Sequence, residues 1–160
     1  MFLTIHGAAG VLIGEQINNF WLALILGFIS HFLIDLIPHG DVELLEDKND
    51  RYHFSQKTVS LLKKITLLDV ATMFSFLTIY YWQGLISISW PVLGGLAGSI
   101  LPDFLQGLYF LTRHPILKRY FKFHSDMHFV LKNLLVSFKT GLAIQFLTLA
   151  ILIFMLVLAK

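Results

Sequence analysis

Long apolar stretches almost free of charge constrain this 160-residue chain more than any other feature. They run over residues 2–14, 20–37, 65–87, 90–111 and 134–159. The last four have the length that a helix needs to cross a hydrocarbon core of ~30 Å at ~1.5 Å per residue. Backbone polar groups cannot be left without partners in lipid, and nothing here alternates like a barrel strand, so these stretches predict helices. We expect an all-α integral membrane bundle of about five apolar helices, of which the first is short.

The composition supports a membrane protein with a single domain. Hydrophobic residues make up 56% of the chain and charged residues 14%, and the mean hydropathy is +0.73. A soluble domain of this size is rarely so apolar, so we expect residues 1–160 to form one transmembrane helical domain in contact with the lipid bilayer. The chain has no cysteine, so a metal would have to be held by nitrogen and oxygen ligands.

Two polar connections, residues 40–64 and 112–133, carry most of the cations. These cations are Lys48, Arg51, Lys57, Lys63, Lys64, Arg113, Lys118, Arg119, Lys122 and Lys132. Because positive charge stays on the cytoplasmic side, we expect a multi-pass protein of the inner (cytoplasmic) membrane. Its amino terminus and both connections would lie in the cytoplasm, and its carboxyl terminus outside. The mixture of cations and aromatic residues in 112–133 favours anionic lipid over nucleic acid as a partner.

The end of the second apolar stretch carries the strongest candidate site, in the segment SHFLIDLIPHGD of residues 30–41. His31, Asp35 and His39 are spaced i, i+4 and i+8, so they share one face as far as the helix continues. Ionisable groups at that depth need a partner, a water-filled cavity or a metal. The imidazole of His31 and the carboxylate of Asp35 could bind one divalent cation together, or they could form a simple hydrogen bond within the bundle.

Three further ionisable residues fall on the same predicted side of the membrane. His6 lies early in the first stretch, Asp69 early in the third and Asp103 late in the fourth. Pro102 predicts a break in its helix, which would aim Asp103 into a cavity. Asp69 and Asp103 are the candidate catalytic carboxylates, although Asp69 could instead pair with a lysine or a histidine.

The polar connection 112–133 adds a histidine pair. His124 and His128 have the i, i+4 spacing of known helical zinc sites, and the same spacing also suits a plain surface helix. The candidate metal ligands of the whole chain are His6, His31, Asp35, His39, Asp103, His124 and His128.

Three short segments over the first two-thirds of the chain form a further pattern. They are His6 followed by Gly7-Ala8-Ala9-Gly10, then His31-x-x-x-Asp35-x-x-Pro38-His39-x-Asp41, and then Leu101-Pro102-Asp103. This pattern resembles the membrane-bound metal-dependent hydrolases, also described as LexA-binding, inner-membrane-associated hydrolases. That family is similar in turn to the zinc-dependent phospholipase C and single-strand nuclease superfamily, whose helical cores bind metal through His-x-x-x-Asp/Glu pairs.

The resemblance implies metal-dependent hydrolysis of a phosphoester, with His31 and Asp35 as ligands. Such relatives often carry an arginine-containing segment that ends in a His-Ser pair. The nearest counterparts in this chain are residues 51–55 and the pair His124-Ser125.

We therefore expect a metal-dependent membrane hydrolase that acts on a phosphoester, such as a phospholipid, at the cytoplasmic leaflet. The metal would be divalent, with zinc expected first and manganese or iron as alternatives. Two other classes compete with this prediction. One is a small transporter or ion-conducting protein with Asp35, Asp69 and Asp103 as a relay, and the other is a membrane scaffold that binds a partner through 112–133 without catalysis.

Overall fold

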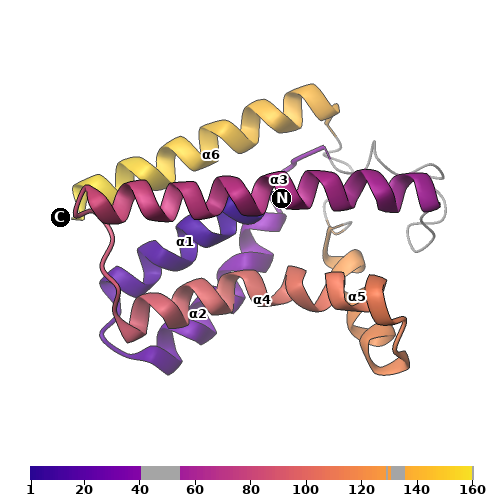
Figure 1. Cartoon of the computed structure of the whole chain (residues 1–160), viewed down its shortest axis with the longest axis horizontal. Helices are drawn as coiled ribbons and strands as arrows, with labels where there is room; N and C mark the ends of the chain where they lie inside the picture. Colours follow the sequence, from indigo (N-terminus) through magenta and orange to yellow (C-terminus); the bar gives the residue numbers. More distant parts are fainter. Residues whose placement is uncertain (41–54, 129, 131–135, 160) are drawn as a thin grey trace.

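The computed structural model describes residues 1–40, 55–128, 130 and 136–159, and over these residues it is helical without a strand (Figure 1). The elements are α1 (Leu3–Gln16), α2 (Phe20–Asp35), α3 (Gln56–Trp82), α4 (Trp90–Thr112), α5 (Pro115–His128) and α6 (Phe138–Leu158). The all-α prediction is therefore confirmed. The connection 112–133 contains a helix of its own, α5, which begins at a proline, a residue favoured at the first helical position.

Most helices begin at a side-chain oxygen that accepts a hydrogen bond from the backbone N–H three residues later. These caps are Asn19 for α2, Ser55 for α3, Ser89 for α4 and Ser137 for α6. Helix α1 has no such cap of its own, and Asp69 of α3 supplies it from outside. The Asp69 carboxylate accepts from the N–H groups of Leu3 and Thr4 and from the Thr4 hydroxyl at 2.6 Å. This contact fixes the start of α1 against α3.

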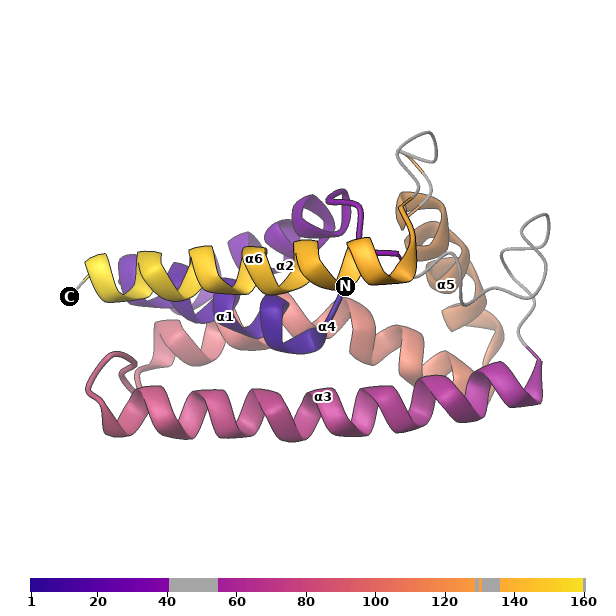
Figure 2. The ribbon, with the colours of Figure 1, turned by 90° about the horizontal axis from the view of Figure 1, so that it is seen from above.

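Helices α1 and α2 form a hairpin that packs on α4, while α3 and α6 pack against α1 (Figure 2). Glycines allow the three inner helices to approach backbone to backbone. A Cβ added at Gly95 of α4 would overlap the carbonyl oxygen of Gly10 in α1, and a Cβ at Gly27 of α2 would overlap the carbonyl oxygen of Gly95. Gly98 meets the backbone of Leu24 in the same way. The close approach brings the start of α1 and the end of α2 beside the middle of α4.

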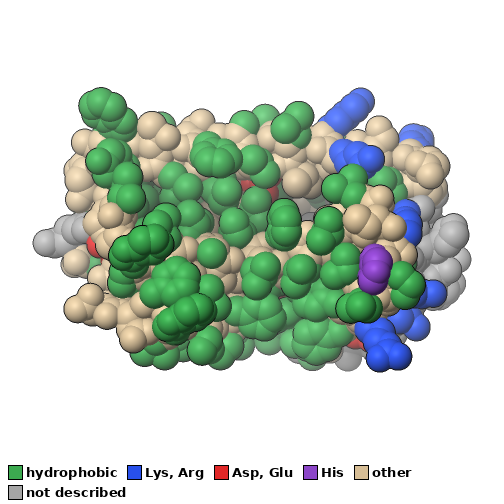
Figure 3. Space-filling model, turned by 60° about the horizontal axis from the view of Figure 1, so that its bottom comes forward, with side chains coloured by type: hydrophobic (Ala, Val, Ile, Leu, Met, Phe, Trp, Pro, Cys, Tyr) green, Lys and Arg blue, Asp and Glu red, His purple; other side chains and the backbone are tan. Residues whose placement is uncertain are grey.

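The apolar core lies where α1, α3, α4 and α6 meet. Its buried members are Ala8, Val11, Phe76, Ile86, Val92 and Leu156. Many other large apolar side chains are exposed on α2, α3, α4 and α6, and the space-filling view shows them covering most of one face (Figure 3). In the part of the chain that the structure describes, α3 and α6 are long and apolar enough to cross a membrane, while α2 is apolar but shorter.

Helix α4 does not break at Pro102, so this prediction is wrong. The helix continues from Trp90 to Thr112 with Pro102 inside it. Proline removes one backbone hydrogen bond and costs about 3 kcal/mol in a helix interior. Pro102 is fully buried and α4 is held against both α1 and α2, so packing keeps the segment helical through the missing bond.

Candidate metal centre

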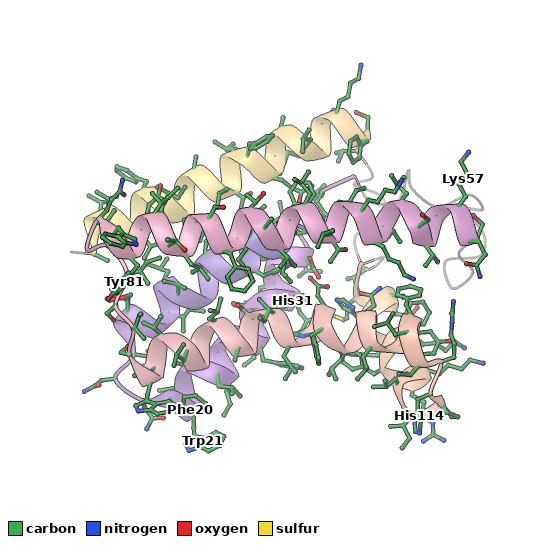
Figure 4. All side chains as sticks on the ribbon, viewed as in Figure 1. Phe20, Trp21, His31, Lys57, Tyr81 and His114 are labelled. Atoms are coloured by element: carbon green, nitrogen blue, oxygen red, sulfur yellow. The ribbon has the colours of Figure 1, made fainter. Side chains whose placement is uncertain are left out.

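Four helices bring histidine and aspartate side chains to one place in the middle of the molecule. These side chains are His6 from α1, His31 and Asp35 from α2, Asp103 from α4 and His124 from α5. We call these five residues the His/Asp cluster. Four of them are buried, and Asp103 keeps 27% of its side chain exposed. Figure 4 shows His31 near the middle of the long axis, between Tyr81 toward one end and Lys57 and His114 toward the other.

The carboxylate of Asp35 is the centre of the cluster. Its Oδ1 lies 3.2 Å from His6 Nε2, and its Oδ2 lies 3.1 Å from His31 Nε2 and 3.5 Å from His124 Nε2. The amino group of Met1 is 3.0 Å from Oδ1. A buried carboxylate is stable as an anion only when cations or hydrogen-bond donors compensate its charge. Asp35 therefore makes this buried site selective for positive charge.

The orientation of His31 is fixed by the backbone of α4. Its Nδ1 is 2.8 Å from the carbonyl oxygen of Ser99, and because a carbonyl can only accept, Nδ1 carries the hydrogen. In the neutral imidazole, Nε2 then holds a lone pair directed at the cluster. A ring nitrogen fixed through its partner nitrogen in this way is the usual arrangement of a metal-binding histidine.

Two imidazole nitrogens face each other in the cluster. The Nε2 atoms of His31 and His124 are 3.1 Å apart, and both lie near the same Asp35 oxygen. Two nitrogens that are each ~2.1 Å from one ion, at angles between about 90° and 110°, lie about 3.0–3.4 Å apart. The observed separation fits two ligands of one divalent cation. A proton shared between the rings would also satisfy this contact, so the geometry admits both.

His6 adds a third imidazole to the cluster. Its ring stacks on His31 with 4.0 Å between the ring centroids, and its Nδ1 is buried without a hydrogen-bond partner in the described residues. Two groups of possible ligands share His31: one consists of His6, His31 and Asp103, and the other of His31, Asp35 and His124. In each group the ligand atoms lie within 4.8 Å of one another. The residues present therefore could hold a metal ion.

Tyr120 is a neighbour of the cluster that the sequence did not single out. Its ring stacks on His124 one helical turn later, with 5.9 Å between centroids, and its hydroxyl is buried without a hydrogen-bond partner in the described residues. Burial raises the pKa of Tyr120, and the negative charges of Asp103 and Asp35 raise it further. The phenol therefore stays protonated at neutral pH and can donate a hydrogen bond. The i, i+4 spacing of Tyr120 and His124 is the feature of the sequence that could have indicated this neighbour.

Not every candidate residue joins the cluster. Asp69, a candidate catalytic carboxylate, caps the start of α1, because an uncapped helix N-terminus attracts a carboxylate. His39 lies outside both ligand groups: its Nδ1 donates to the carbonyl of Ile37 at 2.7 Å, and its own carbonyl accepts from Gln145. The side chain of His128, and residues 41 and 51–54, lie outside the described part. His124 of the counterpart His124-Ser125 belongs to the cluster.

Comparisons of the chain with protein-family models, with curated proteins and with solved structures gave no match.

Proposed function

We propose that this chain is a metal-dependent hydrolase of the inner membrane that acts on a phosphoester at the cytoplasmic leaflet. The observation that carries the proposal is that the Nε2 atoms of His31 and His124 lie 3.1 Å apart and both lie beside the same oxygen of the buried Asp35 carboxylate. Buried charge that is this concentrated is costly, and it is retained where it has a function. The resemblance to the membrane-bound metal-dependent hydrolases supports the same conclusion.

The two ends of the molecule support a membrane orientation. Exposed tryptophans lie at the ends of helices that meet on one side: Trp21 at the start of α2, Trp82 at the end of α3 and Trp90 at the start of α4. Exposed lysines and arginines gather at the opposite end (Figure 3). Along α3, the 18 residue steps from Lys64 to Trp82 span about 27 Å, close to the ~30 Å of a hydrocarbon core.

This pattern of aromatic and basic ends is typical of membrane helices, and cations stay on the cytoplasmic side. The proposed orientation therefore puts the basic end, with α5, in the cytoplasm and the carboxyl terminus outside. Helices α3 and α6 are long and apolar enough to cross the bilayer. We propose that α4, which is 23 residues long, crosses with them while the shorter α1–α2 hairpin is embedded. The cluster then lies in the cytoplasmic half of the membrane.

His31, His124 and Asp35 would hold a divalent metal, with His6 and Asp103 available as further ligands. A divalent metal in this place would supply Lewis acidity toward water and toward a phosphoryl oxygen. Asp103 is the member of the cluster that can reach an incoming molecule, and its Oδ1 would accept the proton of the attacking water. The Tyr120 hydroxyl would donate to an oxygen of the substrate. Arg113, Lys118 and Arg119 are exposed at the same end and would attract an anionic ester.

The first experiment is elemental mass spectrometry of the detergent-purified protein and of three variants. We expect about one zinc, manganese or iron per chain in the parent, and its loss in His31→Ala and Asp35→Asn. His114→Ala is the matched control, because this histidine is exposed and far from the cluster, and it should keep the metal. A folded parent that takes up no metal, even after zinc is added, would refute the proposal and favour protonated imidazoles beside Asp35.

A further inference from the structure

One face of α4 is apolar and exposed along almost the whole helix. It consists of Leu93, Ala97, Phe104, Gly107 and Leu111. These positions follow the 3.6-residue period, so they form one strip, which we call the α4 strip. Leu93 and Leu111 are 18 residue steps apart, which corresponds to about 27 Å, close to the ~30 Å thickness of a hydrocarbon core. No polar side chain interrupts the strip, which is the pattern of a helix face against lipid.

Asp103 connects the α4 strip with the His/Asp cluster. It lies between the strip and the buried face of α4 that carries Gly98, Ser99 and Pro102. In the described residues it is the one member of the cluster whose side chain is substantially exposed, at 27%. Beside it, Phe104 is 64% exposed, and a Cβ at Gly107 would meet nothing within 4 Å. A ligand that passes Asp103 to reach the cluster therefore comes across an apolar surface.

The level of Asp103 along the helix indicates what that surface faces. Asp103 precedes the exposed Arg113 by ten residues, so it lies about 15 Å below the basic end of the molecule. Trp90 is thirteen residues away on the other side, or about 20 Å. With the membrane orientation proposed above, the exposed edge of Asp103 is beneath the lipid headgroups and beside the acyl chains.

We propose that the cluster opens sideways into the lipid beside Asp103 and that its substrate is a lipid phosphoester which enters along the α4 strip. This rests on the proposed function for the reaction, and on the exposed residues of α4 together with the proposed membrane orientation for the entrance. The lipid keeps its chains on the strip while its anionic phosphoryl group turns toward the cluster. In the reaction a water oxygen bonds to phosphorus, the ester P–O bond breaks, and the leaving alkoxide takes up a proton. A water-soluble phosphoester lacks the acyl chains that would pack on the strip.

The entrance can be tested without any metal or substrate, because the chain contains no cysteine and single cysteines can be introduced directly. We would attach a nitroxide spin label to Phe104→Cys in vesicles of phosphatidylcholine and phosphatidylglycerol. Collision with oxygen, which concentrates in lipid, is then compared with collision with a water-soluble nickel chelate. Phe74→Cys, exposed on α3, is the lipid control, and Lys118→Cys, exposed on α5, is the control at the basic end. Gly107→Cys repeats the test on the same strip if Phe104→Cys fails to fold.

We expect the label at residue 104 to collide with oxygen as the label at 74 does, and hardly with the nickel chelate. Nickel accessibility equal to that at 118 would mean that the entrance opens to water, and would overturn the proposal. A label shielded from both reagents would mean that another protein surface, such as a second copy of this chain, covers the strip, and would overturn it too.

A second measurement tests the substrate class. It compares bis(p-nitrophenyl) phosphate, which is soluble, with a dioctanoyl phosphatidyl p-nitrophenol in mixed micelles, which releases the same chromophore. We expect kcat/KM to be about tenfold or more higher for the lipid ester, a difference of at least about 1.4 kcal/mol in barrier. Equal values would refute the lipid substrate. Hydrolysis of neither ester, with a lipid-accessible label at 104, would refute the proposed function and leave the lateral opening in place.

Discussion

A pair of glycine-to-alanine substitutions on α4 tests how the cluster is assembled. Gly95 and Gly107 both lie inside this helix, so alanine improves the intrinsic helix propensity equally at the two positions, by about 0.5–1 kcal/mol. Their surroundings differ completely. A Cβ at Gly95 would overlap the Gly10 carbonyl oxygen and lie 3.1 Å from the Gly14 nitrogen, whereas a Cβ at Gly107 meets nothing within 4 Å.

The expected effects therefore have opposite signs. Gly107→Ala should stabilise the protein by the propensity gain alone, which for a chain of this length raises Tm by about 1–4 °C. At Gly95 the overlapping atoms belong to the backbone of α1 and cannot rotate away, so the overpacking cost of about 3 kcal/mol exceeds the gain. A net loss of about 2 kcal/mol lowers Tm by about 4–8 °C.

The assay is thermal unfolding in detergent, followed by circular dichroism, with metal content measured on the same samples. Gly95 is one turn before Ser99, whose carbonyl orients His31, so Gly95→Ala should also lower the metal content, while Gly107→Ala should not. If both variants shift Tm in the same direction by the same amount, the helices do not approach as closely as described and the explanation of the cluster's geometry fails.

Three further predictions concern single buried contacts. Tyr120→Phe should leave the metal content unchanged and should not destabilise the protein, because it removes a hydroxyl without a hydrogen-bond partner in the described residues. The rate of ester hydrolysis should fall about tenfold. An unchanged kcat would exclude a role of this hydroxyl in the reaction. Asp69→Ala should cost about 1–2 kcal/mol in thermal unfolding by uncapping α1, and loss of metal at unaltered stability would instead restore a role in the site. Gln145→Leu should lower the free energy of unfolding by about 1–3 kcal/mol, because the Gln145 amide accepts a hydrogen bond from the N–H of Phe2 and donates one to the carbonyl of His39. An unchanged free energy of unfolding would contradict these hydrogen bonds.

Local features of the sequence predicted a large part of the fold. The apolar stretches predicted helices where α1, α2, α3, α4 and α6 lie. The i, i+4 spacing of His31 and Asp35 likewise becomes a contact of 3.1 Å, because both residues lie on one turn of a regular helix.

Local sequence patterns could not predict the contacts between residues that are far apart in the chain. The contact between His31 and His124 joins residues 93 apart in the chain, and no spacing rule predicts that α5 turns back onto α2 and α4. Asp69 has the sequence context of an embedded functional carboxylate, and in the structure its carboxylate accepts a hydrogen bond from the otherwise uncapped start of α1. Pro102 has the context of a helix break, which the packing of α4 on two neighbours prevents.

The same packing bears on the transporter alternative. A relay would have to continue from the cluster toward the end that carries the tryptophans, between α1, α2 and α4. In that half the three helices touch through Gly14 and Val92 and through the glycines of α2 and α4, backbone against backbone, which leaves no room for a file of water between them at these crossings. The carboxylate of Glu15, near that end, accepts from the N–H of Ser87 and joins the end of α1 to the α3–α4 connection. A polar cluster that is closed toward the end with the tryptophans and that, among the described residues, is exposed at Asp103 suits a binding or reaction site better than a conducting path.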